Sequence, residues 1–218
     1  MSCLPSTETD PYTGGLEMWE EPRHQLVLSK DSVKVMDVLI PGGDTSLFHV
    51  HRHPTIYVLL NGASYGGQNW GKEWEHSKIM DIAWAGLVQD MSTPYTTSDP
   101  PVYHRVTVPD DETYHLIAMV NTGQGEATSD NSSRPVKNRW FRENRYEIEA
   151  GERSDMLRFE NPVVLVQYSK GNSSVIENGV EHSHKSEKGG LSWHDANTTF
   201  QISNNSDEEI GFVVMEMK

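Results

Sequence analysis

The chain has 218 residues, enough for one large β domain or for two domains of about 100 residues each. Its formal net charge of −14 argues against a nucleic-acid partner, because binding phosphates needs a surface rich in lysine and arginine. No apolar run in the sequence approaches the length of a membrane span, so we expect no membrane as a partner either.

Composition predicts an all-β fold. The 17 glycines and 11 prolines, together with many short runs bounded by Asn, Asp and Gly, are typical of strands joined by tight turns. No amphipathic helical stretch of convincing length is present, and residues 140–146 are expected to form a turn or two of helix at most.

Cys3 is the one cysteine of the sequence, which rules out an intramolecular disulfide. The first six residues, Met-Ser-Cys-Leu-Pro-Ser, include neither the basic nor the apolar region of a secretory leader. We therefore expect a cytoplasmic protein.

The segment from Gly43 to Gly62 carries the most informative pattern. It reads Gly-Asp-Thr-Ser-Leu-Phe-His-Val-His-Arg-His-Pro-Thr-Ile-Tyr-Val-Leu-Leu-Asn-Gly, and its first two histidines are His49 and His51. Alternate side chains of a strand point to the same face, so these two imidazoles can reach one metal ion together.

The intervals in this segment match the first motif of the cupins: Gly, five residues, His-x-His, three residues, Glu, six residues and Gly. The chain therefore resembles the cupin superfamily, with one departure, because Thr55 stands where cupins usually carry a glutamate ligand. The departure removes an anionic ligand and leaves neutral imidazoles. That ligand set resembles the three-His sites of thiol dioxygenases and of the β-diketone-cleaving dioxygenase.

The resemblance implies a third ligand from the second cupin motif, which normally reads Pro, a Gly and then His-x-x-x-Asn. The segment from Pro100 onward resembles it, with His104 in the ligand position and Val108 in place of the Asn. His115 is the alternative, since it also lies on a strand-like segment. His104 is preferred for its proline-rich approach and its distance before the turn at 109–111.

Three acidic side chains remain open as alternatives to the ligand that the first motif lacks. They are Glu73, Glu75 and Asp81, none of which stands at motif spacing. The first two belong to residues 65–75, where three aromatic side chains lie among glycines. This segment either packs at the edge of a barrel or lines the substrate pocket.

Three residues next to the His-x-His pair are candidates for a catalytic role. Thr55 is expected to face the cavity without coordinating the ion, because a neutral hydroxyl competes poorly with water for a divalent ion. Tyr57 shares strand parity with Thr55 and is a candidate acid, base or substrate anchor. His53 precedes Pro54, which keeps it extended, and is expected near the mouth of the pocket.

The other histidines are expected to be solvated loop residues: His76, His182, His184 and His194. His182-Ser-His184 repeats the His-x-His spacing, but it sits among Glu, Lys and Gly, where no strand pattern supports it. We therefore expect the metal site to use histidines of the first half alone.

A second, degenerate copy of both motifs follows. In residues 151–171, Leu157 and Phe159 take the positions of the two motif histidines. Near the C-terminus, Phe200 takes the third histidine position, and Asn204 is retained. The chain thus resembles a bicupin, with two tandem cupin (double-stranded β-helix, jelly-roll) barrels. In the second barrel, hydrophobic residues pack an interior that holds no metal.

We expect residues 1–128 to form the metal-binding barrel and residues 129–218 to form a degenerate, structural barrel, with 123–138 as the linker. Bicupins share an interface between their halves and often exchange N-terminal strands. The resemblance therefore implies that the barrels are inseparable, and that residues 26–28 can complete a sheet outside their own half.

These residues predict a metal-dependent enzyme that acts on a small chelating organic substrate. Oxygen-dependent cleavage by mononuclear non-haem Fe(II) is the preferred reaction, which would make the chain a dioxygenase. Zn, Ni or Mn in the same cage would instead support an isomerase, lyase or hydrolase of a small carbonyl substrate. A non-catalytic cupin that binds a small ligand is the remaining alternative, and a homodimer is left open.

Overall fold

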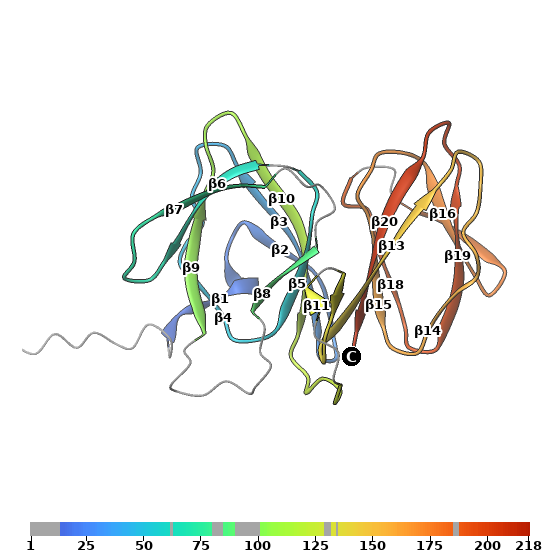
Figure 1. Cartoon of the computed structure of the whole chain (residues 1–218), viewed down its shortest axis with the longest axis horizontal. Helices are drawn as coiled ribbons and strands as arrows, with labels where there is room; N and C mark the ends of the chain where they lie inside the picture. The colour runs from blue at the N-terminus through green and yellow to red at the C-terminus, as the bar shows by residue number, and fades with distance from the viewer. Residues whose placement is uncertain are drawn as a thin grey trace, which may run out of the picture.

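The computed structural model describes residues 14–61, 63–79, 85–89, 101–128, 132–133, 135–184 and 188–218. Its strands form four sheets, two from the first half of the chain and two from the second. Figure 1 shows the result as two barrels side by side, the first coloured blue to green and the second yellow to red. The predicted all-β fold with two tandem barrels is confirmed.

The first barrel contains strands β1 to β10 and the short 3₁₀ helix η1 (Met18–Glu20). One sheet is ordered β1 (Leu16–Glu17), β4 (His49–His51), β9 (Val102–Thr107), β6 (Ala63–Asn69) and β7 (Glu75–Ile79). The other is ordered β2 (His24–Lys30), β3 (Val33–Pro41), β10 (Thr113–Asn121), β5 (Thr55–Leu59) and β8 (Ala85–Gln89). Strand β1 runs parallel to β4, and the other pairs are antiparallel.

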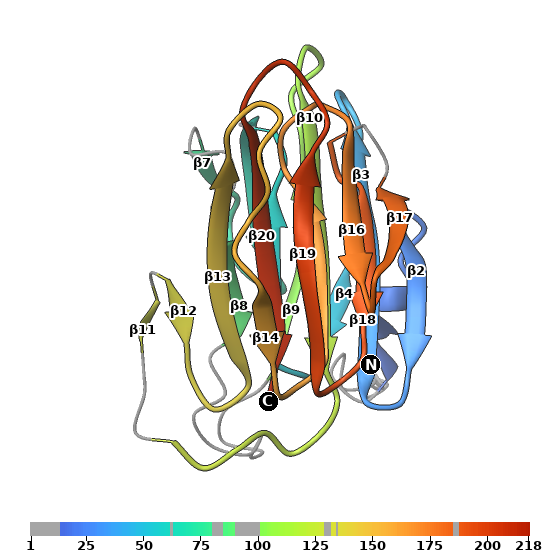
Figure 2. The same cartoon turned by 90° about the vertical axis from the view of Figure 1, so that its right-hand side faces the viewer.

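The second barrel repeats this arrangement, and Figure 2 views it from outside, with its long strands close to vertical. Its larger sheet is ordered β11 (Ser132–Ser133), β12 (Val136–Lys137), β13 (Phe141–Ile148), β20 (Ile210–Met217), β15 (Val163–Gln167) and β18 (Leu191–His194). Its smaller sheet is ordered β14 (Leu157–Phe159), β19 (Thr198–Asn204), β16 (Ser173–Glu177) and β17 (Val180–His184).

The glycines that open the two copies of the first motif have the same backbone conformation. Gly43 has a φ of 77° and Gly151 a φ of 72°, both in the left-handed region that side chains disfavour. At Gly43 a Cβ would also lie 2.6 Å from Oδ1 of Asp110. Each motif thus begins in a turn with a positive φ, and this conformation explains the glycine at both positions.

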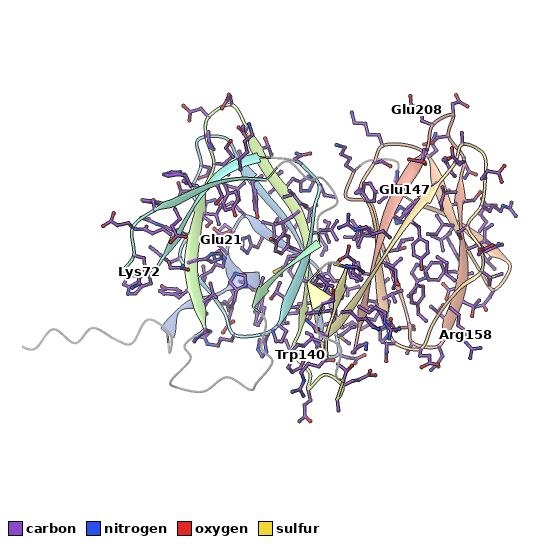
Figure 3. The ribbon with its side chains drawn as sticks, in the orientation of Figure 1. Glu21, Lys72, Trp140, Glu147, Arg158 and Glu208 are labelled. Atoms are coloured by element: carbon purple, nitrogen blue, oxygen red, sulfur yellow. The ribbon has the colours of Figure 1, made fainter. Side chains whose placement is uncertain are left out.

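One hydrophobic cluster joins the two barrels. It combines buried side chains of β3, β5 and β10 with side chains of β12, β13, β15 and β20. Trp140 belongs to this cluster and lies where the two halves meet (Figure 3). Nearby, Nδ2 of the buried Asn121 donates to the carbonyl oxygens of Trp140 at 3.3 Å and of Lys218 at 2.9 Å. The barrels therefore share an apolar interface.

Three local expectations are wrong. Residues 140–146 form no helical turn, since most of them belong to strand β13. Strand β2, which contains residues 26–28, pairs with β3 of its own half, because the two form a continuous hairpin. The expected linker 123–138 carries the short strands β11 and β12, which extend a sheet of the second barrel. The boundary at 128/129 stays a prediction.

Two histidines of the second barrel are buried rather than solvated. His184 lies in β17 and His194 in β18, with 8% and 5% of their surface exposed. His194 stacks on Phe200 at 4.2 Å and hydrogen-bonds to Ser192 and Glu177. Each is the buried last residue of a strand whose other residues are exposed or partly exposed, so no alternation in the sequence marked it. Throughout the described ranges, no helix is both long enough and apolar enough to span a membrane.

Candidate metal centre

Strands β4 and β9 bring the three predicted ligands together. His49 and His51 project from the same face of β4, and His104 is the direct cross-strand partner of His49. One ring nitrogen of each histidine lies within 4.8 Å of the others, so the three form a group that can hold a divalent metal. The Nε2 atoms of His51 and His104 are 3.0 Å apart.

This geometry fits a metal ion. Two nitrogens that each bind one ion at about 2.1 Å and at a right angle stand about 3.0 Å apart. His49 is held by its other nitrogen, because Nδ1 donates to the carbonyl oxygen of Leu47 at 3.0 Å. A carbonyl can only accept, so the neutral His49 ring keeps the lone pair of Nε2 for an ion.

The three rings are held neutral at physiological pH. Burial, then the neighbouring His104, lowers the pKa values of His49 and His51 well below their usual range. Burial, then the neighbouring His24, lowers the pKa of His104 to about 4. Neutral imidazole is the form that binds metals, so an ion would displace no protons from the folded cluster at pH 7.

A cavity of about 270 Å³ opens next to the cluster inside the first barrel. Its apolar wall comes mainly from β3, β9 and β10: Val38, Ile40, Val106, Leu116 and Ala118. Three phenols line it, from Tyr57, Tyr65 and Tyr114. Burial, then the neighbouring Tyr57 and Tyr65, raises the pKa of Tyr114 well above its usual range, so this phenol stays protonated at neutral pH and can donate a hydrogen bond.

Two of the three candidate catalytic residues lie on this cavity. Thr55 and Tyr57 both line it, as their shared strand parity predicts. The Thr55 hydroxyl donates to the carbonyl oxygen of His53 at 3.0 Å, which ties it to its own backbone. His53 does not line the cavity. Its ring stacks with Trp19 instead, at 6.0 Å between centroids.

The alternative ligands lie apart from the cluster. His115 projects from the opposite face of β10 to Tyr114 and hydrogen-bonds to Oδ1 of Asp37 at 2.8 Å. Glu73 is exposed and does not line the cavity, whereas Glu75 does. Asp81 lies outside the described residues.

The segment 65–75 has both of the roles considered for it. Tyr65, Gly67 and Glu75 line the cavity. Its tryptophans face outward, where Trp70 contacts Phe48 at 4.9 Å and Trp74 lies under the guanidinium of Arg105. Residues of β6 and β7 thus form a wall of the pocket, and the two tryptophans between these strands form an outer aromatic surface.

Sequence reasoning missed His24 and Glu21. His24 opens β2, lines the cavity, and its ring centroid lies 4.6 Å from that of His49. Burial lowers its pKa, although the nearby Glu21 carboxylate opposes the shift. No motif spacing marks either residue. The one signal in the sequence was that His24 stands at the start of an apolar run. In the structure this run is strand β2, which pairs with β3.

Comparisons with known proteins agree with this fold. No family model matches the chain, and no curated protein matches it. Among solved structures, AerE from Microcystis aeruginosa is 13% identical, with a TM-score of 0.64 over 88% of this chain and 90% of AerE. A salicylate 1,2-dioxygenase from Pseudoaminobacter salicylatoxidans is 10% identical, with a TM-score of 0.57 over 85% of this chain and 70% of that one. An oxalate decarboxylase is 6% identical, with a TM-score of 0.57 over 86% and 69%.

At these identities the likeness concerns the fold alone. The chain has the cupin fold, with two barrels in tandem, and the fold that its motifs predicted is confirmed. The first barrel carries the histidine cluster, and the matching positions of the second are hydrophobic.

Proposed function

We propose that the chain is a metal-dependent enzyme that cleaves a small chelating organic substrate with molecular oxygen, using mononuclear Fe(II) held by His49, His51 and His104. The observation that carries the proposal is the cluster of three neutral imidazoles beside a cavity in the first barrel. Neutral ligands leave the full charge of a divalent ion available to a chelating substrate. Iron bound there would supply the oxidation chemistry.

The cavity suits a small substrate that has an apolar part and atoms able to accept hydrogen bonds from the tyrosine hydroxyl groups. Its volume of about 270 Å³ lies near the lower end for small-molecule sites. No lysine or arginine is among the described residues that line the cavity. The ion is thus the one strong attraction for an anionic group, and Glu75 would repel a second one.

The protein side chains would orient the substrate and handle its protons. The carbonyl of Leu47 fixes the orientation of the His49 ring. Tyr114, kept protonated by burial, can donate a hydrogen bond to a substrate oxygen, and Tyr57 lines the same cavity. The apolar wall from β3, β9 and β10 excludes water and so strengthens these polar contacts.

A second candidate is a redox-silent isomerase, lyase or hydrolase that uses Zn, Ni or Mn, since imidazoles alone do not select the metal. This candidate is supported by the range of activities among proteins with this fold. The structural neighbours include a protein named as a dioxygenase and one named as a decarboxylase. A ligand-binding cupin without turnover would keep the cavity and the metal. The homodimer and the cytoplasmic location stay predictions.

Oxygen uptake separates these functions. Metal-free protein is loaded in turn with Fe(II), Zn(II), Ni(II) and Mn(II) and offered a panel of small chelating substrates. The proposal expects oxygen consumption with Fe(II), its loss in His49→Ala, and its retention in His115→Ala, whose histidine lies outside the cluster. Turnover without oxygen would favour the isomerase group. Binding without turnover would leave a ligand-binding protein.

A further inference from the structure

A fourth imidazole stands beside the three predicted ligands. His24 is 7% exposed and pairs in register with Val38, and both residues line the metal cavity. Its ring centroid lies 4.6 Å from that of His49, which is 4.7 Å from that of His104. The ring of His24 therefore lies as close to the ring of His49 as the ring of His104 does, although among the described residues the group of ligand nitrogens within 4.8 Å of one another comprises His49, His51 and His104.

His24 is anchored in the same way as His49. Its Nδ1 donates to the carbonyl oxygen of Met18 at 2.7 Å, as Nδ1 of His49 donates to the carbonyl oxygen of Leu47 at 3.0 Å. Because a carbonyl only accepts, each Nδ1 carries the proton and each Nε2 keeps a lone pair. Histidines that bind metals are commonly oriented by such a bond from the other ring nitrogen.

A buried carboxylate adjoins this fourth ring. Glu21 is 1% exposed, and Figure 3 shows it inside the first barrel. Its oxygens accept from the backbone N–H groups of Arg23 at 2.6 Å and Leu47 at 3.1 Å, and Oε2 lies 3.8 Å from Nε2 of His24. The Arg23 guanidinium is shared between Glu21 and Asp44, so one negative charge remains uncompensated in this group.

We propose that His24 is a fourth protein ligand of the metal, and that Glu21 provides beside it the negative charge that cupins usually take from a glutamate at the Thr55 position. The inference rests on the proposed metal site. Four imidazoles would leave two positions of a six-coordinate ion for a chelating substrate. A negative charge close to the ion would favour its retention in an otherwise neutral ligand set.

X-ray absorption on protein loaded with one Co(II) per chain tests the ligand count. Wild type is expected to show four imidazoles bound to the metal. The variant His24→Phe keeps a ring against His49 and is expected to show three. The matched control His115→Ala keeps four. In chelator competition His24→Phe should lose about tenfold to a hundredfold in metal affinity. Three imidazoles in wild type, with metal stoichiometrically bound, would overturn the proposal.

Chemical rescue guards against a folding artefact. His24→Gly is expected to show three imidazoles, and added free imidazole should restore the fourth. Glu21→Gln should keep four imidazoles and lower affinity, whereas unchanged affinity would remove Glu21 from the account. If wild type binds no metal at all, the proposed metal site fails, and that result differs from a bound ion with three imidazoles.

Discussion

Leu157 of β14 is the direct cross-strand partner of Phe200 of β19. In the first barrel the same relationship joins His49 of β4 to His104 of β9. The second barrel thus keeps the register of the metal site while hydrophobic side chains fill its interior, where Phe200 is fully buried. We therefore propose that the second barrel has a structural role.

The structural role predicts that the first barrel does not fold alone. A chain that ends at Ser133 would expose the side chains of β3, β5 and β10 that pack against the second barrel, and Asn121 would lose its acceptors at Trp140 and Lys218. We expect this chain to unfold without cooperativity and to bind a hydrophobic dye. Cooperative unfolding with the metal affinity of the full chain would instead show an independent module.

The substitution Thr55→Glu restores the acidic residue of the cupin motif. Thr55 is 1% exposed and lines the cavity, so a carboxylate there can approach the ion. We expect metal affinity to rise about tenfold or more, because a carboxylate attracts a divalent ion far more than a hydroxyl does, while activity falls or changes. Thr55→Val is the control and should bind metal like wild type. Weaker binding by Thr55→Glu would mean that position 55 does not reach the ion.

The stability of the metal-free protein should depend on its buried histidines. An unfolded histidine titrates near pH 6.5, whereas His104 titrates at about 4 in the fold, and His49 and His51 are also lowered. The unfolded chain therefore binds more protons between these values. The stabilisation is complete above about pH 6.5 and is lost as the pH falls toward about 4.

Urea denaturation of the metal-free protein across this range measures the effect. His104→Leu removes one of the titrating groups, so its unfolding free energy should fall less steeply with acid than that of wild type. Equal slopes would mean that His104 is not held neutral by the fold.

The Glu75 carboxylate should bias the charge of the substrate. We expect Glu75→Gln to lower KM for anionic chelators and to raise it for cationic ones, because Glu75 is the acidic residue among the described lining of the cavity. Since Glu75 is exposed, the change should not exceed about fivefold. Glu73→Gln removes an exposed carboxylate that does not line the cavity and should change neither value. Equal effects of both substitutions would mean that KM depends on the net charge of the protein and not on the position of Glu75.

The parts of the candidate site that depend on the alternation of side chains along a strand could be predicted from the sequence. His49 and His51 share a face because they stand two apart in the sequence. The same reasoning assigned Thr55 and Tyr57 to the cavity. His104 was assigned by its resemblance to the second motif, and its pairing with His49 is visible only in the structure.

The positions of side chains that depend on contacts between strands far apart in the sequence could not be predicted. His24 reaches the cavity through the hairpin of β2 and β3, and no spacing in the sequence encodes that approach. His184 and His194 are buried by their position in the second barrel, although their neighbours in sequence are polar. His53 was expected at the pocket mouth because Pro54 keeps it extended, and its ring stacks with Trp19.

The proposed function requires one metal ion per chain, held in the first barrel by His49, His51 and His104. The most direct measurement is elemental analysis of purified wild type beside the triple variant His49→Ala, His51→Ala, His104→Ala, with folding of both checked by circular dichroism. We expect about one transition-metal ion per wild-type chain and almost none in the variant. Stoichiometric metal in the folded variant, or a second ion in the barrel that contains Leu157 and Phe159, would contradict it.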